Sequence, residues 1–207
     1  MMKYFLILFF AILCNFCRAQ DTSKIVRAQE AQGILKANKH FVFTRTPAES
    51  NKPGNSSQSF KGDDFIYGRV FFNQSLKESL FLEKNDEGHV PADIYVEDLT
   101  NHHSLYISFD LKEEEMDKNY FDFDILPDPD HTLRNSKEFD TGRFSYFINE
   151  EALENRMPVF KFTIGDATGY MQVDFKGINL QQVKARDLEA FRKAHVTVEG
   201  DEKEEAR

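Results

Sequence analysis

The chain has 207 residues, with 26 Lys and Arg against 35 Asp and Glu, which gives a formal net charge of −9. This acidic balance disfavours nucleic acid and anionic membrane surfaces as partners, because both select for basic patches. The two cysteines, Cys14 and Cys17, both lie near the N-terminus. A core held by disulfides is therefore excluded for the rest of the chain.

Residues 1–19 have the layout of a secretory signal peptide. Lys3 precedes an apolar run from Tyr4 to Leu13, and small residues lie at the end of the segment, which closes on Ala19. A short basic region, an apolar core and small residues before the cut are the parts of such a signal. The run is too short to span a bilayer, and the large residues before both cysteines argue against a bacterial lipoprotein.

We therefore expect cleavage after Ala19 and export to the periplasm or the extracellular space. Loss of Lys3 and Arg18 takes the net charge from −9 to −11, and 188 of the 207 residues remain, without cysteine. No later segment reaches the length of a membrane-spanning helix. The mature chain should be soluble and should fold by burial, as one domain of this size can.

The predicted organisation is a loosely ordered lead-in over residues 20–40, a single domain over residues 41–195 and a disordered acidic tail over residues 196–207. Within the domain, short segments rich in aromatic and β-branched residues alternate with turn signals. They are residues 41–46, 63–73, 92–99, 103–111, 120–126, 142–148, 158–165 and 169–180. Residues 47–62 are rich in Ser, Asn, Pro and Gly and predict a surface loop.

The clearest strand pattern is the alternation of Leu105, Ile107, Phe109 and Leu111 with polar residues. It predicts one buried and one solvated strand face. Two hairpins are expected, one around residues 101–102 and one around residues 166–169.

Helices are expected at three places. Residues 74–84 predict one helical turn that links two strands, Asn149 predicts the N-cap of a short helix, and residues 180–195 predict a C-terminal helix. Together these features predict a mainly β fold, an antiparallel β-sandwich of about seven or eight strands with one short linking helix and a C-terminal helix. With 21 Phe in the chain, the core should be rich in phenylalanine.

The stretch YFDFDILPDPDH, residues 120–131, contains four aspartates. Strand alternation puts Asp122 and Asp124 on a solvated face, opposite three apolar residues. Two prolines then end the strand, which leaves Asp128 and Asp130 on a loop. Asp124, Asp128 and Asp130 are a candidate calcium site, because calcium takes several oxygen ligands from such loops, but the EF-hand spacing is missing. A solvated turn without metal is the expected state.

Motifs for catalysis are absent from the sequence. There is no HExxH, GxSxG or Ser-x-x-Lys, and no cysteine is left after cleavage. Six tyrosines fall in predicted strands and offer a ligand platform: Tyr67, Tyr95, Tyr106, Tyr120, Tyr146 and Tyr170.

The sequence therefore favours a non-catalytic binding or accessory module for a protein or glycan ligand, with no cofactor assigned apart from the candidate calcium. One alternative is a secreted hydrolase whose carboxylates come from separate strands, and another is a calcium-dependent binding module. A hydrolase needs buried acids with a raised pKa that face each other across a cleft.

Overall fold

The computed structural model describes residues 40–47, 56–85, 90–133 and 144–205, with side chains up to residue 194 in the last range. The chain divides into two units, Met1–Lys36 and Ala37–Arg207, and all described residues lie in the second. The predicted signal peptide and nearly all of the predicted lead-in lie outside the described residues. Within the described part of the chain, no helix is long and apolar enough to cross a membrane.

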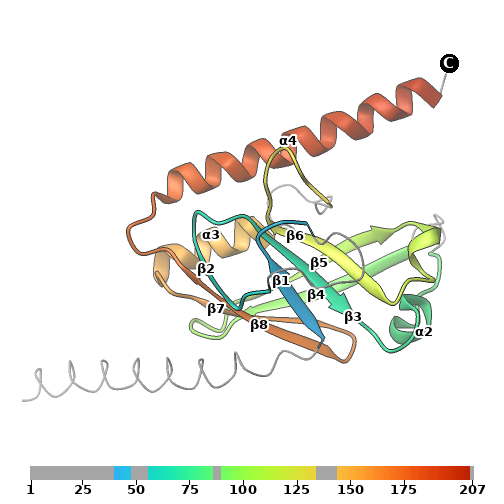
Figure 1. The fold of residues 1–207 in the computed structure, drawn as a ribbon, viewed down its shortest axis with the longest axis horizontal. Coiled ribbons are helices and arrows are strands. Elements are labelled where there is room, and N and C mark those ends of the chain that lie inside the picture. The colour runs from blue at the N-terminus through green and yellow to red at the C-terminus, as the bar shows by residue number, and fades with distance from the viewer. Residues whose placement is uncertain (1–39, 48–55, 86–89, 134–143, 206–207) are drawn as a thin grey trace, which may run out of the picture. The chain divides into compact units, whose positions relative to one another are not determined.

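The described residues form two sheets (Figure 1). The first has the antiparallel order β1-β3-β6, with β1 (Phe41–Thr44), β3 (Ile66–Phe71) and β6 (Tyr120–Leu126). The second has the order β2-β8-β7-β4-β5, with β2 (Ser59–Lys61), β8 (Ala167–Asp174), β7 (Val159–Ile164), β4 (Val90–Asp98) and β5 (Ser104–Leu111). The predicted mainly β fold is confirmed.

One pairing departs from the antiparallel expectation. β2 pairs with β8 in parallel, with Ser59 opposite Gln172. β2 lies inside the segment that we predicted as a surface loop, because three residues are too few for a visible alternation. The two predicted hairpins, β4–β5 and β7–β8, are both present.

The helices of the described residues are α2 (Leu76–Leu80), the 3₁₀ turn η1 (Glu113–Glu115), α3 (Phe144–Glu154) and α4 (Leu180–Glu205). α2 is the linking turn that the sequence predicts between β3 and β4 (Figure 1). α4 begins as predicted at Leu180 and continues to Glu205, into the residues that were expected to form a disordered acidic tail.

The core is rich in phenylalanine, as expected. On β5, Ile107, Phe109 and Leu111 are buried, and Leu105 packs against the core, so the predicted alternation is confirmed. The two sheets touch through aromatic rings. Phe43 on β1 lies 5.4 Å from Phe162 on β7, measured between ring centroids, and Phe109 lies 5.6 Å from Phe121 on β6.

The prediction of a strand over residues 142–148 is wrong where the structure describes them. Phe144 to Ile148 are the start of α3, and Asn149 lies within this helix, buried, and is not its N-cap. Aromatic content suggested a strand, but Phe144, Phe147 and Ile148 are spaced by three and four residues, which puts them on one helix face. All three are buried, and Phe144 packs 5.3 Å from Phe123.

The prediction that Asp122 and Asp124 lie on a solvated face of β6 is wrong for Asp124, which is only 4 % exposed. Its neighbour Asp122 is paired with Arg69 on β3, whose Nε and Nη2 donate to the carboxylate over 2.5 and 2.7 Å. Tyr120 covers Arg69, with the guanidinium 4.3 Å from the ring centroid. A buried Arg needs such a bidentate partner, since an unpaired charge there would be strongly destabilising.

Candidate functional site

The three aspartates of the candidate calcium site follow one another at the end of β6, and each has a protein partner. Asp124 accepts a hydrogen bond from the Leu133 N–H over 2.9 Å. Asp128 accepts from the Asp130 N–H over 3.0 Å, and this bond is the main cause that lowers the pKa of Asp128. The Asp130 carboxylate pairs with Lys193 on α4 over 2.5 Å.

A buried tyrosine fixes this loop to the sheet. The Tyr67 hydroxyl accepts from the Asp128 N–H over 2.9 Å and donates to the His131 carbonyl over 3.0 Å. Burial raises the pKa of Tyr67 to about 12, so the hydroxyl keeps its proton and remains a donor. Among the described residues, no three His, Cys, Asp or Glu side chains form a group that could hold a metal ion. The calcium site stays a prediction.

A second cluster of acids lies between the β4–β5 turn and α3. The Asn101 amide donates to both Asp98 and Glu151 over 3.0 Å each. His103 lies 2.9 Å from Glu151, measured from Nδ1 to Oε1, and the Thr100 N–H donates to Asp98 over 2.8 Å. These contacts fasten α3 to the turn.

The cluster has perturbed electrostatics. Burial, and then the nearby Glu151, raise the pKa of Asp98 to about 6. The hydrogen bond to Glu151 raises the pKa of His103. Asp98 has 0 % of its surface exposed, so in this arrangement it cannot touch a substrate. What the geometry can do is respond to pH, because both shifts favour the protonated forms.

A pocket of about 270 Å³ lies at the other end of β4. The pocket exists because β4 extends further than β7, the strand that lies beside it in the sheet. Pairing between β4 and β7 begins at Tyr95 opposite Thr163, and β7 ends at Ile164. The first residues of β4 therefore extend past the β7–β8 turn, and the end of α2 lies beside the space that remains.

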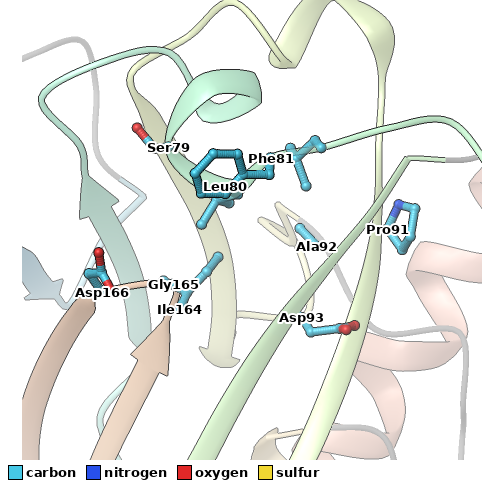
Figure 2. A pocket seen from close by; sticks show the side chains of 10 residues that line it. Ser79, Leu80, Phe81, Pro91, Ala92, Asp93, Ile164, Gly165 and Asp166 are labelled. Atoms are coloured by element: carbon cyan, nitrogen blue, oxygen red, sulfur yellow. The ribbon is translucent and has the colours of Figure 1, made fainter.

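The pocket is lined from three directions, as Figure 2 shows. The end of α2 contributes one side, the start of β4 a second and the β7–β8 turn a third. The lining residues are Ser79, Leu80, Phe81, Leu82, Pro91, Ala92, Asp93, Ile164, Gly165 and Asp166. Gly165 has φ +53°, and a side chain on it would collide with Leu80. A bare glycine here lets the turn approach α2 closely.

Phe81 has the least expected conformation in the pocket. It follows α2 in the left-handed region, with φ 52° and ψ 43°. The Leu82 N–H donates to the Lys77 carbonyl over 3.1 Å, which makes this helix end a Schellman motif, whose left-handed position is usually glycine. Leu76 and Leu82 are buried on either side, yet Phe81 is 88 % exposed. We call the cavity beside this ring the Phe81 pocket.

The predicted tyrosine platform forms only in part. Tyr67 is buried, and Tyr120 covers Arg69. Tyr95 and Tyr106 do lie together, paired across β4 and β5 with ring centroids 4.8 Å apart. Tyr106 is 70 % exposed, so this pair presents an aromatic surface to solvent.

Sequence reasoning missed both Phe81 and the Asp98 cluster. The only signal for the cluster would have been two acids in separate elements, which is too common to select a pair. Phe81 had no signal, because no glycine marks the end of α2. Comparison with known protein families, with curated proteins and with solved structures found no match for this chain.

Proposed function

We propose that this protein is an exported, non-catalytic binding module and that the Phe81 pocket is its ligand site. The observation that carries the proposal is the exposed phenylalanine in a left-handed helix end. A β-carbon in this conformation costs about 1–2 kcal/mol of folding free energy. An exposed ring offsets little of that cost, because it buries little apolar surface. Strained residues of this kind cluster at ligand clamps.

The pocket suits a small apolar group. Its volume of about 270 Å³ is close to the lower end of the range for small-molecule sites. Leu80, Phe81 and Ile164 offer apolar walls. Small fragments that fill such a site are expected to bind with a dissociation constant of about 1 mM.

The test is an NMR titration of the purified protein with two probes of similar size and shape, choline and the neutral 3,3-dimethylbutan-1-ol. We expect at least one probe to shift the amide signals of Phe81, Ala92 and Gly165. Phe81→Gly should abolish these shifts. Leu153→Ala, which removes another exposed apolar side chain, on α3, should leave them unchanged. If neither probe shifts these amides, the pocket is not a ligand site.

The architecture and the compartment belong to the same proposal. The phenylalanine contacts between β1 and β7 and between β5 and β6 support two sheets packed face to face as a β-sandwich. The layout of residues 1–19 supports export with cleavage after Ala19. N-terminal sequencing of exported protein should begin at Gln20, and an intact chain recovered from the cytoplasm would contradict this.

The hydrolase alternative has one observation in its favour, the raised pKa of Asp98 beside Glu151 on a separate element. A general acid needs such a pKa, but it must also reach the bond that it cleaves. Loss of hydrolysis of an aryl glycoside in Asp98→Asn, with the fold intact, would support the alternative. We expect no hydrolysis by either form.

A further inference from the structure

The charges that line the Phe81 pocket are all negative. Asp93 lies on β4 and Asp166 on the β7–β8 turn, on two different sides of the pocket, and the lining contains no Lys, Arg or His (Figure 2). Asp93 accepts a hydrogen bond from the Ser108 hydroxyl, which fixes its carboxylate. Within the described residues, neither Asp93 nor Asp166 forms an ion pair. The pocket therefore repels anions and attracts a cation.

Two tyrosine rings lie on the same sheet face as Asp93, beside the pocket lining. Asp93 and Tyr95 are alternate residues of β4, so they lie on one face about 7 Å apart along the strand. Tyr106 packs on Tyr95 from β5, and Phe81 lines the pocket itself. The face of an aromatic ring attracts a cation within about 6 Å of its centroid.

The walls select among cations. A metal ion requires several converging oxygen ligands, and here apolar side chains separate the two carboxylates. A bare ammonium group would lose strong hydration on entering. An ammonium group that carries methyl or other alkyl groups presents an apolar surface around its charge, and it matches both the rings and the acids.

We propose that the Phe81 pocket binds a quaternary or alkylated ammonium group, with Phe81 supplying a ring face and Asp93 and Asp166 supplying the opposite charge. This inference rests on the proposed function, since it names the chemistry that the same pocket accepts.

The experiment compares choline with 3,3-dimethylbutan-1-ol, in which carbon replaces the charged nitrogen. We expect choline to bind about 5- to 20-fold more tightly, as one or two weak cation–π contacts and a solvent-exposed carboxylate imply. The preference should fall when NaCl is raised from 20 to about 500 mM, because screening acts on the charge alone. Equal affinity, or tighter binding of the alcohol, would overturn the ammonium inference and leave the proposed function standing. Absence of binding by both probes would overturn the proposed function.

Three variants separate the contributions. Phe81→Leu keeps an apolar side chain without a ring face, so the preference for choline should fall while binding of the alcohol persists. Asp93→Asn keeps the acceptor for Ser108 and removes the charge, and it should weaken choline alone. Asp63→Asn makes the same charge change at an exposed position outside the pocket lining and should change neither. An unchanged preference in both Phe81→Leu and Asp93→Asn would refute the assignment of these roles.

Discussion

Replacing Phe81 by glycine and by alanine tests the left-handed helix end directly. Both variants lose the ring, so their difference reports the backbone alone. A β-carbon in the left-handed region costs about 1–2 kcal/mol, whereas glycine loses about 0.5–1 kcal/mol more conformational entropy on folding. We therefore expect Phe81→Gly to be more stable than Phe81→Ala by about 0.5–1 kcal/mol.

The ring itself should contribute little to folding. Phe81 is 88 % exposed, and a phenylalanine buries about 200 Å² when it is fully covered. The covered remainder of about 25 Å² is then worth only about 0.6 kcal/mol. The glycine variant should thus stay within about 1 kcal/mol of the unchanged protein. Truncation of the fully buried Phe162 should instead cost about 3–5 kcal/mol.

Urea denaturation measures these differences. With a slope of about 2 kcal/mol per molar urea, the midpoint of Phe81→Gly should lie about 0.25–0.5 M above that of Phe81→Ala. An alanine variant as stable as the glycine variant would show that residue 81 is not left-handed in solution. A loss of about 3 kcal/mol in Phe81→Gly would show that the ring is packed and would remove the support for a ligand site.

Three further predictions concern the rest of the domain. Because the folded pKa of Asp98 is raised to about 6 from 3.8 and that of His103 is raised too, the stability from both groups is present at low pH and is lost as pH rises. Between pH 4 and 7 the free energy of unfolding should fall by on the order of 2 kcal/mol through Asp98, and Asp98→Asn should flatten this profile in urea titrations. Calcium should raise the melting temperature no more than magnesium at equal ionic strength. A calcium-specific rise that disappears in the double variant Asp128→Asn and Asp130→Asn would contradict the metal-free turn. In Gly68→Ala, the new β-carbon would overlap a buried phenylalanine ring of β6. This should cost about 1–3 kcal/mol, and unchanged stability in calorimetry would argue against the β3–β6 packing.

The parts of the fold that sequence predicted are those that local pattern decides. β5 shows its alternation within eight residues, and the two hairpins have turn residues between two strand patterns. The start of α3 was missed because Phe144 and Phe147 have high strand propensity. Their burial depends on phenylalanines of the sheets: Phe123 and Phe162 pack against Phe144, and Phe160 packs against Phe147. Tertiary contacts overrode local preference there.

The candidate site was less predictable than the fold. Asp98 and Glu151 are brought together where α3 packs against the β4–β5 turn, a contact between segments far apart in the sequence, and Asn101 bridges them. The Phe81 pocket depends on how far β4 extends beyond β7, a register that no short window of sequence contains. Its aspartates, Asp93 and Asp166, are single residues in a strand and a turn, where aspartate is common.

The parallel pair β2–β8 has a consequence for the order in which the chain can fold. Ser59 on β2 pairs with Gln172 on β8, more than a hundred residues later in the chain. Arg186 on α4 donates to the carbonyls of Asp63 and Asp64. The segment around β2 therefore gains its contacts from β8 and α4, which come much later in the sequence. Contacts between residues so far apart in sequence form slowly. A nascent chain cannot close this edge of the sheet until about residue 186 has left the ribosome. If the protein is exported, as we propose, this edge of the precursor stays open until the late segments have been made.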